Sequence, residues 1–248
     1  MGREEGECPY CGSTVRRRSV IHALSTQLFG ASLALVDFPI RKDINGIGLS
    51  DWTGYAEGLA KKFTYKNTFY HCEPKLDITN PDPTEYEKYD FVISSDVFEH
   101  VPPPISSAFE GVRKLLKPGG VMIFSVPYVD GATKEHFPEL HRFSIERRGR
   151  VGTLMNETID GRKQEFTDLT FHGGPGSTLE MRLFGKESLA ENFRRAGFVS
   201  VCECSGEIPE AGILWLKYDP EKAPYRPFIY GLDTPPWVAK RGGDCRVP

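Results

Sequence analysis

The chain has 248 residues, of which 39% are hydrophobic and 26% are charged, and its formal net charge is −3. This composition is typical of one sizeable globular domain, and the near balance of acids and bases argues against nucleic-acid binding through overall positive charge. No apolar run approaches the roughly 20 residues that cross a bilayer. The polar start MGREEGECPYCG does not resemble a secretory signal, so we expect a cytoplasmic protein without a membrane partner.

Short apolar segments alternate with helical patterns along most of the chain. A helix is predicted over residues 17–29, where apolar side chains recur at helical spacing before Gly30. YDFVISS (residues 89–95) has the continuous apolar character of a strand that is buried on both faces. This alternation predicts an α/β fold with a doubly wound, mostly parallel, Rossmann-like sheet. The other predicted strands are 32–38, 44–50, 75–78, 121–128 and 200–204, and the other predicted helices are 51–63, 105–120 and 187–198.

Three parts of the chain differ in composition. Residues 1–15 form a short turn-rich segment with two cysteines. Residues 16–218 carry the α/β pattern, interrupted at about residues 129–185 by charges, histidines and glycines, which we interpret as an insertion or lid. Residues 219–248 are rich in proline and glycine and predict a poorly structured tail along the surface.

The strongest motif occupies residues 89–128, YDFVISSDVFEHVPPPISSAFEGVRKLLKPGGVMIFSVPY. An aspartate-led apolar strand, a Glu–His pair, a helix, LLKPGG and a further strand follow one another. This order resembles the second half of class I S-adenosylmethionine-dependent methyltransferases, and the likeness extends over roughly residues 8–200. The resemblance implies S-adenosylmethionine as the cofactor. In an open α/β sheet the ligand lies outside the carboxyl ends of the strands, where we expect Ser94 and Ser95 to contact it.

The stretch INGIGLSDW (residues 44–52) resembles the second strand of that family and the start of the next helix, and not its glycine-rich loop. In this register Gly48 takes the place of the acid that binds both ribose hydroxyls. Asp51 is our substitute for that acid, a role compatible with capping the helix. LALVDFPIRK is then the first strand, and Asp37 stands where the glycine-rich loop would begin. CPYCGSTVRRR together with VDFP resembles a branch of the family with such a degenerate loop.

LDIT (residues 76–79) is similar to the ending of the family's third strand. In the family an aspartate there accepts a hydrogen bond from the adenine amino group, and the next backbone amide donates to the ring. Asp77 and Ile78 are the matching positions. The alternative is that Asp77 only shapes the turn before NPDP.

Histidines are the candidates for removing a proton from the methyl acceptor, because imidazole is the usual base near neutral pH. His100 follows the strand end that faces the sulfonium in the family. His136 and His141 lie in the insertion that would cover the acceptor, and we predict His136 first and His141 second as the base. In the run FHGGPGSTLEMR, the glycines would allow close backbone approach, and Glu180 or Arg182 would contact a polar acceptor; the alternative is a plain hairpin turn.

We predict no metal-binding residue in the chain. Cys8 and Cys11 form half of a zinc knuckle, whereas a structural zinc site needs four ligands. Cys202 and Cys204 would complete a site only if their strand lay close to that pair, so zinc at Cys8 and Cys11 stays open as an alternative.

The predicted function is methyl transfer from S-adenosylmethionine to a small-molecule or saccharide acceptor, with oxygen favoured over nitrogen. The alternative is a scaffold of the same fold that has lost catalysis together with the glycine-rich loop. A nicotinamide oxidoreductase would require G-x-G-x-x-G after the first strand, which we do not find. We interpret the three arginines at 16–18 as a solvated helix start, so no nucleic-acid partner is expected.

Overall fold

The computed structural model of the chain describes residues 7–148, 151–172, 178–214 and 235–246. Its centre is a six-stranded sheet made of β1 (Arg41–Leu49), β2 (Phe63–Thr68), β3 (Tyr89–Ser95), β4 (Leu116–Ser125), β13 (Ser200–Glu203) and β14 (Trp237–Lys240). The strand order is β13-β14-β4-β3-β1-β2. β2, β1, β3 and β4 are parallel, and β14 is antiparallel to both of its neighbours.

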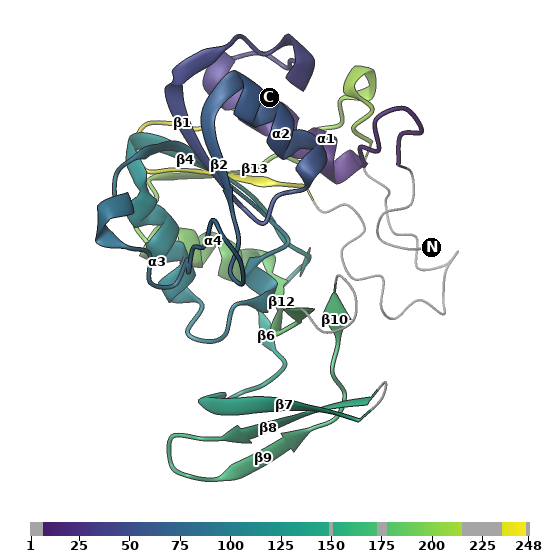
Figure 1. The fold of residues 1–248 in the computed structure, drawn as a ribbon, viewed down its shortest axis with the longest axis vertical. Coiled ribbons are helices and arrows are strands. Elements are labelled where there is room, and N and C mark those ends of the chain that lie inside the picture. Colours follow the sequence, from purple (N-terminus) through teal and green to yellow (C-terminus); the bar gives the residue numbers. More distant parts are fainter. Residues whose placement is uncertain (1–6, 149–150, 173–177, 215–234, 247–248) are drawn as a thin grey trace.

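Helices cover both faces of the sheet (Figure 1). They are α1 (Val15–Phe29), α2 (Thr53–Lys62), α3 (Ser106–Leu115) and α4 (Lys186–Arg195). One apolar core joins α1 and α2 to alternate residues of β3 such as Phe91, and the other joins α3 and α4 to the residues between them, such as Val92. The predicted doubly wound α/β fold is therefore confirmed. None of the described helices is both long and apolar enough to pass through a membrane.

The predicted first strand at residues 32–38 does not form. Leu35–Asp37 make a single 3-10 turn, η1, and the Phe38 ring packs against Phe29 and Phe63 beside the start of β1. INGIGL (residues 44–49) instead belongs to β1, which lies between β2 and β3. Because β1 is the first strand of the sheet along the chain, the interpretation of this stretch as the second strand is wrong. Residues 41–43 are polar and exposed, so apolar character does not indicate where this strand begins.

Two other predicted elements have different extents in the structure. The third strand is reduced to an isolated parallel bridge between Phe69 and Lys75. The helix predicted over residues 105–120 ends at Leu115, and LKPGG already belongs to β4, where the pairing with β3 is irregular.

The end of the chain contributes to the sheet. β14 lies between β4 and β13 and buries Trp237, Val238 and Ala239, so the prediction of a surface tail over residues 219–248 is wrong for this strand. A four-residue apolar strand is easily overlooked within a proline- and glycine-rich composition. Residues 215–234 of that prediction lie outside the described chain.

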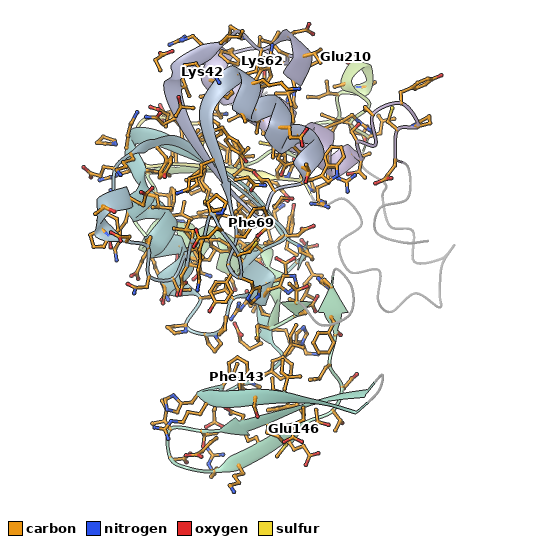
Figure 2. All side chains as sticks on the ribbon, in the orientation of Figure 1. Lys42, Lys62, Phe69, Phe143, Glu146 and Glu210 are labelled. Atoms are coloured by element: carbon orange, nitrogen blue, oxygen red, sulfur yellow. The ribbon has the colours of Figure 1, made fainter. Side chains whose placement is uncertain are left out.

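The segment predicted as an insertion or lid forms three small sheets. β5 (Tyr128–Val129), β6 (Lys134–Glu135) and β12 (Arg182–Gly185) join next to the main body, and β10 (Phe171–His172) pairs with β11 (Thr178–Leu179). β7 (Arg142–Arg148), β8 (Val151–Glu157) and β9 (Lys163–Phe166) make an antiparallel sheet that extends away from the body (Figure 1), with Phe143 and Glu146 on β7 (Figure 2). The glycine-rich residues 173–177 lie outside the described chain.

Candidate active site

The carboxyl ends of β1 and β3 lie side by side at the point where the strand order reverses. From β1 the chain continues outward to β2, and it then returns to β3 and proceeds to β4 on the other side. Ser50 and Asp96 directly follow the two strands with φ of 56° and 57°, a left-handed conformation that turns the backbone away from the sheet. Ligands of doubly wound sheets bind in the crevice at such a switch point. This edge is therefore the candidate cofactor crevice.

Ser95 lies at this edge, as predicted, and Arg16 of α1 contacts it. The Arg16 Nη1 atom donates to Ser95 Oγ over 2.5 Å and lies 2.9 Å from Asp96 Oδ2. Ser95 Oγ also lies 2.9 Å from Ser125 Oγ at the end of β4. Ser94 points to the other face of the sheet and is fully buried, so of the two predicted serines only Ser95 has a partly exposed side chain at this edge.

The three arginines at 16–18 are not a solvated helix start, which corrects that prediction. The Arg17 guanidinium lies 4.2 Å from the centre of the Trp52 ring and donates to the Gly12 carbonyl, while Arg18 donates to the Gly212 carbonyl. Positive charges at a helix amino terminus oppose the helix dipole. That unfavourable placement is the sequence signal that these arginines have partners elsewhere in the protein.

The Asp51 carboxyl group faces the interior of the protein. The Tyr55 hydroxyl donates to Oδ1 over 2.7 Å, and the Tyr65 hydroxyl donates to Oδ2. Burial raises the pKa of Asp51 to about 7, although both tyrosine hydrogen bonds act in the opposite direction. A Cβ atom at Gly48 would overlap with the Tyr65 hydroxyl and the Asp51 carboxyl, so glycine makes room for this network. Neither Gly48 nor Asp51 lies as a ribose ligand would, and the network instead holds the loop between β1 and α2.

Asp77 and Ile78 each have a hydrogen-bonding group that no residue of the described ranges occupies. Asp77 Oδ1 accepts from the amide and the hydroxyl of Thr79 at 2.9 and 2.7 Å, whereas Oδ2 accepts from no described residue. The Ile78 amide likewise donates to no residue within the described ranges. A Cβ atom at Gly111 of α3 would overlap with the Ile78 carbonyl oxygen, so the turn lies directly against α3. An acceptor beside a donor fits the hydrogen-bonding edge of adenine.

Asp37 lies at the opposite edge of the sheet, contrary to its prediction as a cofactor ligand. It is exposed in η1, which precedes the amino end of β1. Lys62 at the end of α2 donates to the carbonyl groups of Val36 and Phe38 on either side of it. Because ligands bind at the carboxyl ends of the strands, Asp37 is not positioned to contact the cofactor.

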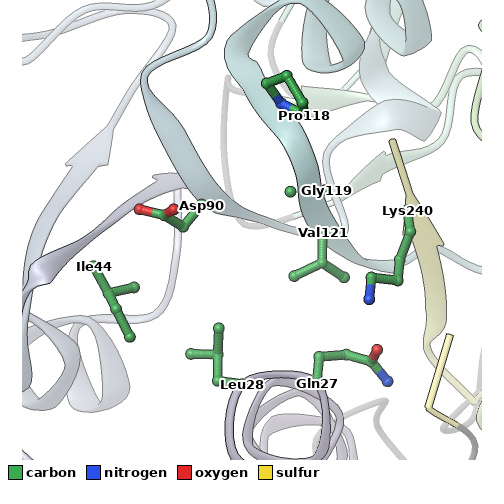
Figure 3. Close-up of a pocket in the computed structure, with 9 residues that line it drawn as sticks. Gln27, Leu28, Ile44, Asp90, Pro118, Gly119, Val121 and Lys240 are labelled. Carbon is green, nitrogen blue, oxygen red and sulfur yellow. The ribbon is translucent and has the colours of Figure 1, made fainter. Parts of the chain in front are cut away.

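A cavity of about 250 Å³ also lies at this amino edge (Figure 3). Asp90 at its wall accepts hydrogen bonds from Lys117 Nζ at 2.7 Å and from the Asn45 amide at 2.8 Å, so this carboxylate links the starts of the strands. The cavity is therefore separate from the cofactor crevice. Its lining residues are Gln27, Leu28, Ile44, Asp90, Pro118, Gly119, Gly120, Val121 and Lys240.

Three histidines and two glutamates meet beside η3 (Phe98–His100), and we call them the histidine cluster: Glu99, His100, His136, His172 and Glu180. Glu180 is its centre, with Oε1 2.7 Å from His136 Nε2 and Oε2 2.8 Å from His172 Nε2. Burial opposes the ionisation of Glu180, but the hydrogen bonds and charges of the two imidazoles outweigh it and lower the pKa of Glu180 to about 2.

His100 extends the cluster toward the cofactor crevice. Its ring packs edge to face on His172 with 5.1 Å between ring centres, and its Nδ1 lies 2.9 Å from the Leu179 carbonyl oxygen. Burial lowers the pKa of His100, and the charge of Asp96 at the end of β3 acts on it in the opposite sense. The predicted residues His136 and His100 thus belong to one cluster.

Arg182 anchors the insertion to η3. Its side chain is fully buried, and Nη1 donates to the carbonyl groups of Phe98 and Val101 at 3.0 and 2.6 Å. Nε donates to Glu135 over 2.8 Å, and the Met181 amide donates to the Glu99 carbonyl. Arg182 is thus a structural anchor and not the acceptor ligand that the sequence suggested, whereas Glu180 lies at the centre of the cluster.

His141 lies outside the cluster. It is exposed at the start of β7, and its amide donates to the Asn156 side chain of β8 over 2.9 Å. Cys8 and Cys11 also lie outside the cluster, and within the described ranges they belong to no group of three potential metal ligands. The sequence placed His141 with His136 because the two are neighbours in the chain, and the turn into β7 separates their side chains.

The chain matches known proteins over most of its length. A family model described as "Methyltransferase domain" matches residues 27–203. None of the curated protein sequences shows significant similarity to this chain.

Solved methyltransferase structures have similar folds at low sequence identity. The 1,6-didemethyltoxoflavin N1-methyltransferase of Burkholderia thailandensis, with bound 1,6-didemethyltoxoflavin and S-adenosylhomocysteine, is 14% identical, covers 92% of this chain and 78% of its own, and has a TM-score of 0.45. CalS10, an S-adenosylmethionine-bound amino pentose methyltransferase from Micromonospora echinaspora, is 16% identical, covers 93% of both chains, and has a TM-score of 0.45. An S-adenosylmethionine-dependent methyltransferase from Clostridium acetobutylicum is 13% identical, with coverage of 89% and 97% and a TM-score of 0.45.

The family match spans well over half of the chain, from the end of α1 to the end of β13. It includes the switch point between β1 and β3, the turn at Asp77 and Ile78, and the histidine cluster. The chain therefore belongs to the class I S-adenosylmethionine-dependent methyltransferases.

Proposed function

We propose that the protein transfers the methyl group of S-adenosylmethionine to an oxygen atom of a small-molecule or saccharide acceptor. The histidine cluster beside the cofactor crevice is the observation that carries this proposal. S-adenosylmethionine supplies a methyl group that is already activated on its sulfonium. The protein then has to orient the acceptor and remove its proton, and both contributions lower the barrier substantially.

The cofactor is proposed to lie along the carboxyl edge of β1 and β3, with adenine at the turn formed by Asp77 and Ile78. There the free Oδ2 of Asp77 accepts from the exocyclic amino group, and the free amide of Ile78 donates to the ring. Ser95 and the ion pair of Arg16 with Asp96 hold the floor of the crevice in a fixed position. This arrangement assigns no cofactor contact to Gly48, Asp51 or Asp37.

His136 is the proposed general base. Its Nε2 lies 2.7 Å from the Glu180 carboxylate, which only accepts, so Nε2 carries the proton and Nδ1 keeps its lone pair. The carboxylate fixes this tautomer and stabilises the imidazolium that forms when Nδ1 takes a proton from an acceptor hydroxyl. A hydroxyl loses its proton as the new bond to carbon forms, which favours oxygen as the acceptor atom.

The proposal also covers the cellular compartment and the partners of the enzyme. We place it in the cytoplasm, where thiols such as those of its six free cysteines stay reduced. We propose no nucleic-acid partner, because the arginines at 16–18 contact the protein itself. The alternative of an inactive scaffold relies on the missing glycine-rich loop, and it remains the second candidate; the residues of the histidine cluster favour an active enzyme.

The test is release of S-adenosylhomocysteine from a panel of hydroxylated small molecules and saccharides. With an acceptor that turns over, His136→Ala should lower kcat by about 10²-fold or more, while calorimetry shows nearly unchanged S-adenosylmethionine affinity. His71→Ala is the matched control, because His71 is exposed and lies outside the cluster. Equal turnover of the two variants would place the base elsewhere. Cofactor binding without turnover of any acceptor would favour the scaffold.

A further inference from the structure

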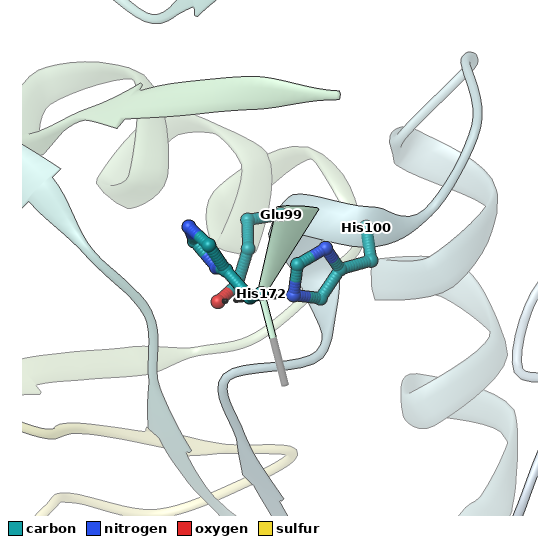
Figure 4. A group of neighbouring side chains, drawn as sticks. All are labelled: Glu99, His100 and His172. Carbon is teal, nitrogen blue, oxygen red and sulfur yellow. Dashed lines mark ion pairs between the residues drawn. The ribbon is translucent and has the colours of Figure 1, made fainter. Parts of the chain in front are cut away.

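Three members of the histidine cluster have the residue types and the spacing of a metal site. One ligand atom each from Glu99, His100 and His172 lies within 4.8 Å of the other two (Figure 4). Glu99 and His100 come from η3, and His172 comes from β10 in the insertion, so folding brings this set together. Two imidazoles and one carboxylate are the protein ligands of many open zinc and iron sites.

The hydrogen bonds of His100 leave one nitrogen available for a metal. Nδ1 lies 2.9 Å from the Leu179 carbonyl oxygen, and because a carbonyl only accepts, Nδ1 carries the proton. The lone pair is then on Nε2, which lies 3.7 Å from Glu99 Oε1. Metal-bound histidines commonly donate their second ring N–H to a backbone carbonyl in this way.

His172 has the complementary arrangement with a carboxylate. Its Nε2 lies 2.8 Å from Glu180 Oε2, and this short contact with a carboxylate favours the proton on Nε2 and the lone pair on Nδ1. That Nδ1 is buried and bonds to no residue in the described part of the chain. Each imidazole thus has an acceptor beside one ring nitrogen, which leaves the other nitrogen for a metal ion, and such neighbours commonly orient metal-bound histidines.

The surroundings favour a cation at this position. Glu99 is fully buried, and it brings a carboxyl group within reach of the two imidazoles. Glu180 adds a second carboxylate behind His172. Imidazole ligands select ions such as Zn²⁺, Fe²⁺ or Ni²⁺ over Mg²⁺ and Ca²⁺, which prefer oxygen ligands.

We propose that Glu99, His100 and His172 bind one divalent transition-metal ion of the zinc class, with Glu180 and the Leu179 carbonyl as outer-shell partners. Three protein ligands leave coordination positions open for water or for an oxygen atom of a ligand. If the proposed function holds, an acceptor hydroxyl bound there would lose its proton more easily, because a metal ion lowers the pKa of a bound oxygen. The metal site itself does not depend on that function.

The experiment uses the full chain carrying Cys8→Ser and Cys11→Ser, so that this pair of thiols does not compete for the metal. After treatment with a chelator, the protein is titrated with Zn²⁺ in a calorimeter, and thermal unfolding is followed with and without Zn²⁺. We expect one site per chain and a rise in Tm on Zn²⁺ addition, since a ligand that binds only the folded state stabilises it. Mg²⁺ should not produce this rise.

Variants then locate the site. His100→Ala and His172→Ala should each weaken Zn²⁺ binding by about 100-fold or more and abolish the rise in Tm, and Glu180→Gln should weaken it by about 10- to 100-fold. His71→Ala removes an exposed imidazole and should bind Zn²⁺ like its parent. Binding of S-adenosylmethionine by each variant checks that it is folded.

Two outcomes would overturn the metal site. In the first, Zn²⁺ binds with the same affinity in the folded His100→Ala and His172→Ala variants, which would mean an adventitious ion only. In the second, the parent shows no Zn²⁺-dependent rise in Tm, which would mean that the cluster binds no ion of this class. Methyl transfer by the chelator-treated protein would retain the proposed function without the metal. A bound metal without methyl transfer would retain the site and refute that function.

Discussion

The buried carboxyl group of Asp51 makes the folding stability depend on pH in an unusual direction. Two effects compete at this group: burial favours the neutral acid, and the hydroxyls of Tyr55 and Tyr65 favour the carboxylate. With only 4% of the residue exposed, burial is the larger effect and raises the pKa of Asp51 from 3.8 to about 7. Since the folded pKa exceeds the unfolded one, the stabilisation is fully present below pH 3.8 and is lost as the pH rises to about 7.

Asp51→Asn removes this titration and retains the size of the side chain. Between pH 5 and pH 7 the folded protein keeps a proton that the unfolded chain has lost, so each pH unit costs the natural protein about 1.4 kcal/mol. Over these two units the free energy of unfolding of Asp51→Asn, relative to the natural protein, should rise by about 2 kcal/mol, because Asp51 is already half ionised at pH 7. The relative stability should then stay constant above pH 7 to 8.

Urea unfolding at pH 5, 6, 7 and 8, followed by tryptophan fluorescence, measures this difference. Asp37→Asn is the matched control, because Asp37 is exposed in η1 and its substitution should leave the pH dependence unchanged. If the difference between Asp51→Asn and the natural protein is the same at pH 5 and pH 8, Asp51 is ionised throughout. The tyrosine hydroxyls would then outweigh burial, and the reasoning from desolvation would be refuted.

Three further substitutions test the crevice and the anchor of the insertion. Asp77→Ala should weaken S-adenosylmethionine binding by about 1 to 3 kcal/mol in calorimetry, and an unchanged affinity would place adenine elsewhere. Gly111→Val should also weaken cofactor binding, because its side chain would displace the Ile78 carbonyl; an unaltered affinity and Tm would show that α3 does not hold the turn. Arg182→Met leaves the buried Val101 carbonyl without its side-chain donor, while the Phe98 carbonyl keeps the Val101 amide, and should lower the free energy of unfolding by about 1 to 3 kcal/mol in urea. Arg162→Met, at an exposed site, should change it by less than 0.5 kcal/mol.

The strands and helices with strong periodicity were predictable from sequence. β3 has the predicted bounds because seven residues with a nearly continuous apolar run leave little choice of structure. α2 and α4 follow from their apolar spacing and from the loops that precede them. The prediction of the first strand fell on the wrong segment because residues 32–38 contain apolar side chains, as a buried strand does. In the structure Leu35 and Phe38 belong to a loop that packs against the core. Apolar character reports burial, and it does not distinguish a strand from a packed loop.

The site was predictable only in part, for the same physical reason. His100 and His136 were identified from their types and neighbours, whereas the role of Glu180 depends on a contact with His136 from 44 residues earlier in the chain. The inward position of Asp51 depends on Tyr65, which belongs to the next strand. Contacts between distant segments are decided by packing, and residue spacing along one element does not contain them.

The position of η3 couples the two halves of the proposed site. It follows the end of β3 within a few residues, so Asp96 lies at the carboxyl end of β3, where we propose the cofactor, and Glu99 and His100 lie in the histidine cluster. Arg182 holds this short segment through main-chain carbonyls, which do not depend on the side chains that perform the chemistry. A shift of the insertion would therefore move the proposed base His136 and the segment that follows β3 together. In-line methyl transfer requires both reacting atoms to be held in register, and a single anchored segment between them meets that requirement.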